Sequence, residues 1–164
     1  YQNTLFVLTA DHTQMKQRDR YLTDPGAFDV PLVLFHPGRR LTVPNADRIA
    51  QHTDIPATVL DALGVQPGAC MHIGRSLLQA GPGEALFLFQ GHFYYLRDSL
   101  QVRYNPERGF QPTRRLDLTT YQPGAPVDGG GAAQRYARAY LQYYFDGLLD
   151  NDWVRPCKPP APAP

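Results

Sequence analysis

The sequence predicts an α/β core followed by a small antiparallel sheet and a C-terminal helix. Two short apolar runs near the start have the composition of buried strands, and a well-delimited helix follows them. The second half then changes to short strand-like runs and one long amphipathic segment. We expect residues 1–80 to form the α/β core, residues 81–150 the small sheet with its closing helix, and residues 151–164 a Pro-rich disordered tail.

Two strands are expected near the start of the chain. Residues 5–8 are a continuous apolar run with aromatic and β-branched members, which is typical of a strand covered on both faces in a parallel sheet. Residues 32–35 repeat this pattern and end before Pro37 and Gly38. The polar residues 13–29 between them predict a surface loop with at most one turn of helix.

A short helix is expected over residues 53–64. Thr53 or Asp54 can cap its first turn, and Gly64 can end it. The glycine-rich residues 66–85 then predict a loop. The side chains expected on the apolar face of this helix are Ile55, Val59, Leu60 and Leu63.

Short strand-like runs separated by turns characterise the second half. They are ALFLF, HFYYLR, LQVRY and RRLDL, at residues 85–89, 92–97, 100–104 and 114–118. In the third run, Gln101 and Arg103 alternate with apolar neighbours, so one face of this strand is expected to be exposed.

One long helix is expected after this meander. Apolar side chains at spacings of three and four form a wide stripe that would pack on the small sheet, and Gly147 is expected to loosen the last turn. The stripe consists of Ala133, Tyr136, Ala137, Tyr140, Leu141, Tyr144, Phe145 and Leu148.

Composition argues against two kinds of partner. The formal net charge is +1 and the basic residues are scattered, so no basic patch predicts nucleic acid or an anionic membrane surface. No apolar stretch approaches the roughly 18 residues of a membrane span. Cys70 and Cys157 are too few and too far apart to indicate a disulfide framework or a zinc-knuckle spacing.

An acid and an imidazole, Asp11 and His12, stand directly after the first predicted strand. Open α/β sheets bind ligands outside the carboxyl ends of their strands, and both side chains are good ligands for Mn²⁺ or Zn²⁺. The alternative is that Asp11 caps a turn and His12 is an ordinary polar loop residue. The residues alone leave both interpretations open, because two ligands do not complete a metal site.

The other histidines give weaker indications. His52 precedes the expected helix near the same crevice, so it could contact substrate or metal, or simply prepare the helix N-terminus. His36 ends a strand and is expected to be structural or exposed. Structural roles are also expected for His72 and His92 at the surface, Asp54 as a helix cap, and Arg75 as a surface arginine rather than an anion contact.

Four separated motifs carry a family resemblance. NTLFVLTADHT, FDVPLVLFHPG, QHTDIPATVLDALGV and GRSLL, in this order and at these distances, resemble the C-terminal half of the sulfatase-like branch of the alkaline phosphatase superfamily. The similarity is greatest to membrane-anchored enzymes of the lipoteichoic acid synthase and phosphoglycerol transferase type. It implies a partial alkaline-phosphatase-like sheet with helices, and it extends from residue 3 to about residue 149, including the strand at Leu116, Asp117 and Leu118.

The resemblance implies a metal-dependent hydrolase or transferase acting on sulfate or phosphate esters. In that family the aspartate and histidine after this strand bind the catalytic divalent metal, which assigns Asp11 and His12 as ligands for Mn, Mg, Ca or Zn. His52 stays the weaker, substrate-binding candidate. The family's nucleophile and its remaining acidic ligands lie in the N-terminal half, so we expect no catalytic nucleophile in this chain and no turnover by the chain alone. Residues 13–29 also lack the His-Gly pair that sulfatases often carry there.

The expected partners follow from the same resemblance. They are the missing N-terminal half of the same protein and a sulfate or phosphate ester, with no nucleic acid, and the membrane-anchored parent would work at the periplasmic or extracellular face of the cytoplasmic membrane. A sheet without its other half exposes apolar faces and open edges, which favours a homodimer of this chain. The rival hypothesis is a non-catalytic α/β binding or self-association module.

Overall fold

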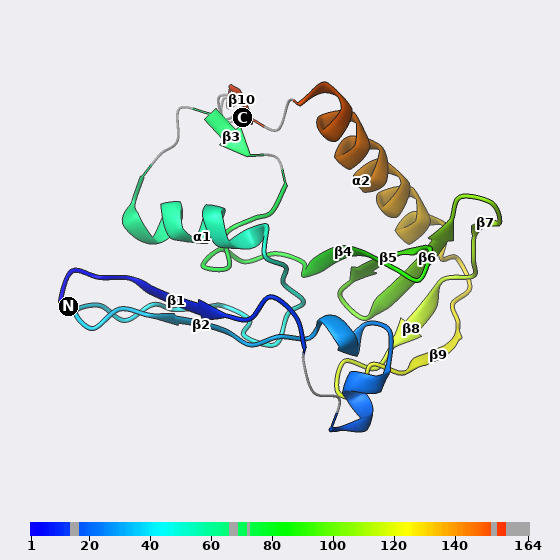
Figure 1. Ribbon diagram of the computed structural model, residues 1–164, viewed down its shortest axis with the longest axis horizontal. Coiled ribbons are helices and arrows are strands. Elements are labelled where there is room, and N and C mark those ends of the chain that lie inside the picture. Colours follow the sequence, from blue (N-terminus) through cyan, green and yellow to red (C-terminus); the bar gives the residue numbers. More distant parts are fainter. Residues whose placement is uncertain (14–16, 66–68, 72, 152–153, 157–164) are drawn as a thin grey trace.

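The computed structural model describes residues 1–164 except 14–16, 66–68, 72, 152–153 and 157–164 (Figure 1). Its described strands form one six-stranded sheet and two separate strand pairs, β1–β2 and β3–β10. Helix α1 lies beside the β1–β2 pair, and helix α2 lies over the six-stranded sheet (Figure 1). The α/β part, the small antiparallel sheet and the closing helix therefore follow one another in the predicted order.

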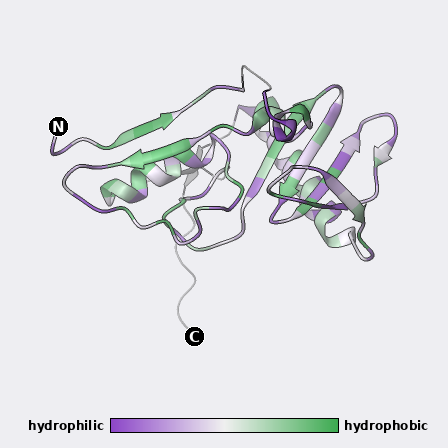
Figure 2. Ribbon diagram, turned by 90° about the horizontal axis from the view of Figure 1, so that it is seen from below, coloured by the Kyte–Doolittle hydropathy of each residue, from purple (hydrophilic) through white to green (hydrophobic). Residues whose placement is uncertain are grey.

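The strands β1 (Phe6–Thr9) and β2 (Leu32–Phe35) lie where the apolar runs predicted them. They pair antiparallel, with Leu8 opposite Val33, so the expected parallel pairing is wrong. Burial on both faces is also wrong, because these two side chains are 57% and 49% exposed. Figure 2 shows the pair coloured as hydrophobic along both strands, beside α1.

The connection between β1 and β2 explains their antiparallel direction. Its described residues hold two 3₁₀ turns, η1 (Asp19–Leu22) and η2 (Gly26–Phe28), and no α-helix. A parallel pair needs a crossover, usually an α-helix, whereas antiparallel strands do not. The expected surface loop thus contains two short turns of helix where at most one was predicted.

Helix α1 (Asp54–Leu63) has the predicted bounds. Gly64 ends it in the left-handed conformation at φ 67°, as expected, and its N–H bonds to the Asp61 carbonyl. Of the expected apolar face, Ile55, Val59 and Leu60 are half-buried, but the prediction is wrong for Leu63, which is 58% exposed. The fully buried residues are Asp54, Thr58 and Ala62.

The six-stranded sheet is an antiparallel meander with neighbours in the order β4, β5, β6, β8, β9, and with β7 paired to β6. All four predicted runs contain a strand, but the strand predicted at 114–118 ends at Leu116, so the prediction is wrong for Asp117 and Leu118, which lie in a turn. β7 and β9 are additional. Gln101 was expected to be exposed but is only 4% exposed. The face away from α2 is also covered, since the segment containing η1 and η2 lies against it and the Tyr94 hydroxyl donates to Asp24. The strands are β4 (Glu84–Phe89), β5 (His92–Arg97), β6 (Leu100–Asn105), β7 (Gly109–Phe110), β8 (Arg114–Leu116) and β9 (Pro123–Pro126).

Helix α2 (Gly131–Asp150) packs on the sheet through the small members of the predicted stripe. Ala133 and Ala137 form the core with Tyr95 and Val102 of the sheet. The small side chains let the helix approach closely, and Leu141 is also buried, whereas Tyr136, Tyr144, Phe145 and Leu148 are exposed. Gly147 does not loosen the helix as expected, because it is buried within a helix that continues to Asp150.

The last strand pair joins two segments that were expected to be irregular. β3 (Ala69–Met71) lies within the predicted loop and pairs antiparallel with β10 (Val154–Pro156), so the loop prediction is wrong for these three residues. His72, Cys157 and the end of the tail lie outside the described residues. The division into residues 1–80, 81–150 and 151–164 stays a prediction.

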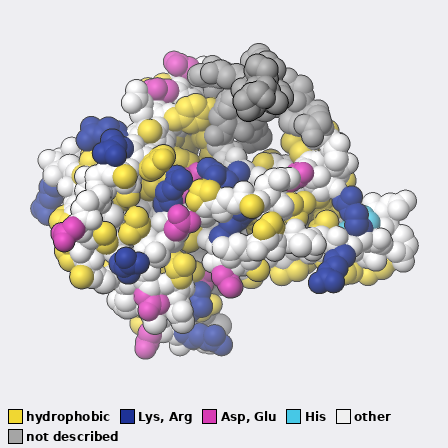
Figure 3. Space-filling model, turned by 180° about the vertical axis from the view of Figure 1, so that it is seen from behind, with side chains coloured by type: hydrophobic (Ala, Val, Ile, Leu, Met, Phe, Trp, Pro, Cys, Tyr) yellow, Lys and Arg dark blue, Asp and Glu magenta, His cyan; other side chains and the backbone are white. Residues whose placement is uncertain are grey.

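The surface carries mixed charge. On the face drawn in Figure 3, Lys and Arg side chains are interspersed with Asp and Glu, and hydrophobic side chains lie between them. Among the described residues, no helix has both the length and the apolar character needed to cross a membrane.

Candidate functional site

Asp11 and His12 follow the end of β1 and project into solvent, with their side chains 85% and 63% exposed. They do not diverge. The His12 amide donates to Asp11 Oδ1 at 2.9 Å, and His12 Nε2 lies 3.4 Å from Asp11 Oδ2. The strand end therefore presents a carboxylate oxygen and an imidazole nitrogen at nearly the same point.

The contacts of the His12 ring fit a metal ligand. Nδ1 lies 3.4 Å from the Thr13 carbonyl oxygen, which can only accept, and in the tautomer with the proton on Nδ1 the Nε2 lone pair faces the side of Asp11 Oδ2. Two atoms that each bind one ion at about 2.0–2.2 Å lie about 3–3.5 Å apart. The 3.4 Å between Nε2 and Asp11 Oδ2 falls in this range.

The described residues supply only part of a coordination sphere. They contain no group of three or more His, Cys, Asp or Glu side chains arranged to hold a metal ion. Asp11 and His12 thus fit two positions of a site whose other ligands would come from elsewhere, and their role as ligands stays a prediction.

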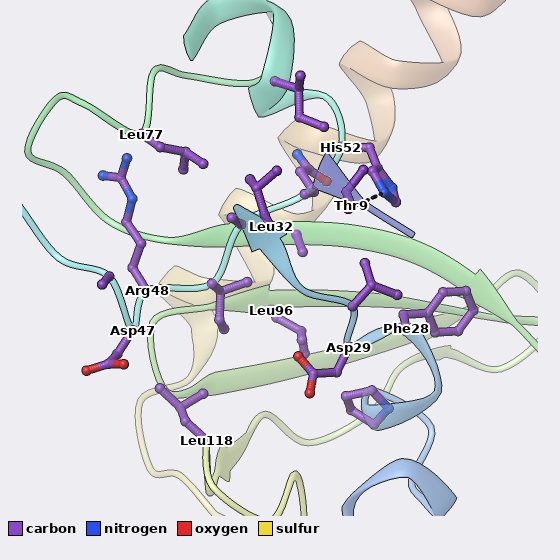
Figure 4. Close-up of a pocket in the computed structure, with 18 of the residues that line it drawn as sticks. Thr9, Phe28, Asp29, Leu32, Asp47, Arg48, His52, Leu77, Leu96 and Leu118 are labelled. Atoms are coloured by element: carbon purple, nitrogen blue, oxygen red, sulfur yellow. Dashed lines mark hydrogen bonds between the residues drawn. The ribbon is translucent and has the colours of Figure 1, made fainter. Parts of the chain in front are cut away.

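A cleft of about 930 Å³ opens beside Asp11, between the β1–β2 pair and the six-stranded sheet. Its lining mixes aliphatic and aromatic side chains with polar and charged ones, a combination that can bind a small molecule and orient it. Figure 4 shows Thr9 and His52 together at one end of the view, Asp47 and Arg48 at the other, and Leu96 between them.

His52 lies at this cleft, as predicted, but its ring is turned to β1. Nε2 is 2.9 Å from the Ala10 carbonyl oxygen and 3.5 Å from the Thr9 hydroxyl. Because the carbonyl only accepts, Nε2 carries the proton. The structure therefore brings His52 next to the candidate ligands through the backbone of Ala10, and its substrate-binding role stays untested.

Two arginines at the cleft are already committed to other groups. Arg48 donates to the carbonyl oxygens of Gln79 and Ser76 at 2.8 and 2.9 Å, which leaves little of it for an anion. Arg20 forms an ion pair with Asp29, whose other carboxylate oxygen accepts from the Tyr121 hydroxyl at 3.2 Å. Burial, followed by the charge of Asp29, raises the pKa of Tyr121. Sequence reasoning missed this cluster, because Tyr121 lies far along the chain from the segment that carries Arg20 and Asp29.

The remaining candidates have structural partners. Asp54 is 3% exposed and does not act as the predicted N-cap: its carboxylate accepts the amides of Gln51 and Arg75, at 2.9 and 2.8 Å. The Arg75 side chain pairs with Glu84 at 2.6 Å, consistent with the structural role expected for it. His36 and His92 each bond to backbone two residues away, at Gly38 N and Gln90 O.

Comparison with known proteins gives one informative match. No family model and no curated protein matches the sequence. The structure is similar to a crystal structure described as a protein in the alkaline phosphatase superfamily from Vibrio parahaemolyticus, with a TM-score of 0.74 and 22% sequence identity. The match covers 96% of this chain and 37% of that chain. The predicted resemblance is thus confirmed at the level of the fold, and this chain spans little more than a third of the protein it matches.

Proposed function

We propose that this chain is part of a metal-dependent, sulfatase-like hydrolase or transferase acting on sulfate or phosphate esters. The observation that carries the proposal is the 3.4 Å spacing of Asp11 Oδ2 and His12 Nε2 beside a large cleft. The fold shared with an alkaline phosphatase superfamily protein supports it. The nucleophile and the other ligands would belong to the rest of the parent protein, so this chain alone would have no turnover.

Asp11 and His12 would hold one side of a divalent cation, either Mn, Mg, Ca or Zn. Once bound, such an ion supplies Lewis-acid stabilisation of the negative charge that develops on the transferred group. The Thr13 carbonyl would keep the His12 ring in the tautomer that offers Nε2. The adjacent cleft would admit the alcohol part of the ester and exclude water from it.

The test uses the complete parent protein, with 4-nitrophenyl sulfate and 4-nitrophenyl phosphate as probes. We expect Asp11→Ala and His12→Ala each to lower metal-dependent hydrolysis by about 100-fold or more, because each removes a ligand. Chelation should abolish the activity, and added Mn²⁺ should restore it. The matched controls Asp128→Ala and His92→Ala change exposed or peripheral residues and should keep normal activity. Undiminished activity in both ligand variants would contradict the proposal.

The cellular setting is part of the proposal. The sequence resemblance to membrane-anchored enzymes supports a parent that works at the periplasmic or extracellular face of the cytoplasmic membrane. A reporter enzyme that folds only in an oxidising compartment, fused to the C-terminus of the complete parent, should be active. A reporter that stays inactive while the protein accumulates would place the catalytic part in the cytoplasm.

A second candidate function is that of a non-catalytic binding or self-association module. It is favoured by the exposure of Leu8 and Val33, which face each other across the strand pair. Ester hydrolysis distinguishes the enzyme from the binding module. If the chain is a binding module, the intact protein should either not hydrolyse the ester or hydrolyse it independently of Asp11 and His12.

A further inference from the structure

We propose that His52 is a positioning residue, whose Nε2–H holds the carbonyl of Ala10 and so fixes the backbone from which Asp11 and His12 project. The inference rests on the proposed function for the role given to those two residues. The contact itself is a property of this chain, and it can be tested without a metal.

The direct contact is short and its direction is determined. Nε2 lies 2.9 Å from the oxygen of Ala10, the residue immediately before Asp11. A carbonyl oxygen has no proton to give, so the neutral ring must carry its hydrogen on Nε2. That nitrogen is then committed to the backbone and is not offered to a metal or to a substrate proton.

The segment that carries His52 is rigidly held, which a positioning group requires. It forms a turn in which the amides of Asp54 and Ile55 bond to the carbonyls of Gln51 and His52, at 2.9 and 3.1 Å. The Asp54 carboxylate returns to the Gln51 amide at 2.9 Å. Both ends of the turn are therefore closed by hydrogen bonds, and helix α1 continues directly from it.

A second segment anchors this turn from behind. The other oxygen of the buried Asp54 carboxylate accepts the Arg75 amide at 2.8 Å. Gly74 packs so closely that a Cβ built on it would lie 1.9 Å from the Thr53 carbonyl oxygen. The turn before α1 and residues 74–75 are thus locked together, and this unit presents His52 to β1.

The Asp11–His12 pair is consequently held on both sides. His52 fixes Ala10 before it, and the Thr13 hydroxyl donates to the Ala27 carbonyl at 2.6 Å after it. The two side chains are exposed, so packing does little to orient them. Backbone anchors at the flanking residues can supply that orientation, as second-shell groups do for metal ligands.

The first experiment uses the 164-residue chain without metal. Nitrogen NMR of the His52 ring should report the Nε2–H tautomer. His52→Ala should speed hydrogen exchange of the His12 amide, and His52→Gln should largely restore protection, because Gln places its amide nitrogen near the position of Nε2. His92→Ala is the matched control and should change nothing at residue 12. A ring protonated on Nδ1, or unchanged exchange in His52→Ala, would overturn the proposal.

The second experiment uses the complete parent protein and titrates Mn²⁺. His52→Ala should raise the Mn²⁺ concentration for half-maximal hydrolysis by about 10–100-fold, the range seen for second-shell variants, and saturating Mn²⁺ should recover kcat. His52→Gln should stay close to the native value. A raised KM for the ester at saturating Mn²⁺, unrepaired by Gln, would instead indicate a substrate contact and overturn the inference. If Asp11→Ala and His12→Ala both leave activity unchanged, the proposed function fails, and the NMR and exchange results still decide the role of His52.

Discussion

The carboxylate of Asp54 and the backbone amide of Arg75 are joined by a hydrogen bond of 2.8 Å, although 21 residues separate them. This bond links the start of helix α1 to the GRSLL segment and leaves the carboxylate almost entirely buried. Two of the motifs that carry the family resemblance are therefore parts of one structural unit. This unit contacts the candidate site through His52, which bonds to the carbonyl of Ala10.

The stability of the chain should depend on pH through two aspartates of α1, whose contributions change with pH in opposite directions. Burial raises the pKa of Asp54. Its contribution to the free energy of unfolding is therefore full below the ordinary pKa of 3.8 and is lost as the pH rises through the raised pKa. Hydrogen bonds from Ser76 and Gln79 lower the pKa of Asp61. Its contribution to the free energy of unfolding is therefore present above pH 3.8 and is lost as the pH falls through the lowered pKa.

Urea unfolding between about pH 3 and pH 7 checks both signs. The difference in unfolding free energy between the native chain and Asp54→Asn should shrink as pH rises. The difference for Asp61→Asn should grow over the same range. Parallel trends for the two variants would contradict the assignment of burial as the dominant influence at Asp54.

Gly74→Ala should destabilise the chain by more than about 2 kcal/mol, because its φ of 85° is strained for alanine and the new Cβ would collide with the Thr53 carbonyl. Gly64→Ala is a matched control, since Gly64 has a φ of 67° but nothing within 4 Å of the added Cβ. It should cost only about 1 kcal/mol. Thermal and urea unfolding measure the difference in stability between the two variants. Equal losses of unfolding free energy would show that the close contact between Gly74 and Thr53 does not contribute to the effect.

Tyr94→Phe should loosen the segment that contains η1 and η2. The Tyr94 hydroxyl donates to Asp24, and burial raises the pKa of Tyr94 to about 12. Losing this bond should cost about 1–2 kcal/mol and speed amide exchange over residues 19–28. Tyr95→Phe is the matched control, because Tyr95 lies in the same strand but donates to Glu84 at 2.6 Å. Exchange that changes equally in both variants would contradict the prediction.

The isolated chain should self-associate through the β1–β2 pair. Leu8 is 57% exposed on a short strand pair whose outer edges pair with no other strand among the described residues, which leaves an open site for a further strand. Leu8→Lys should shift sedimentation toward the monomer. Leu148→Lys, at an exposed site on α2, should not. Association that persists in Leu8→Lys but disappears in Leu148→Lys would place the contact on the helix instead.

Local sequence patterns predicted most of the elements. The apolar run at residues 32–35, the helix stop at Gly64 and the HFYYLR strand all lie where the sequence indicated, because turn chemistry and periodicity act over a few residues. The adjacency of Asp11 and His12 after a strand was likewise visible in the sequence, and the fold comparison supports the resemblance that those motifs suggested.

Tertiary structure decided what the local patterns could not. The burial of Asp54 on α1 depends on an amide from residue 75, and the orientation of His52 depends on the carbonyl of Ala10, which directly follows β1. The direction of β2 depends on a connection without a crossover helix. Each of these features is a hydrogen bond or a packing contact between distant segments, and its free energy exists only once the chain has brought those segments together.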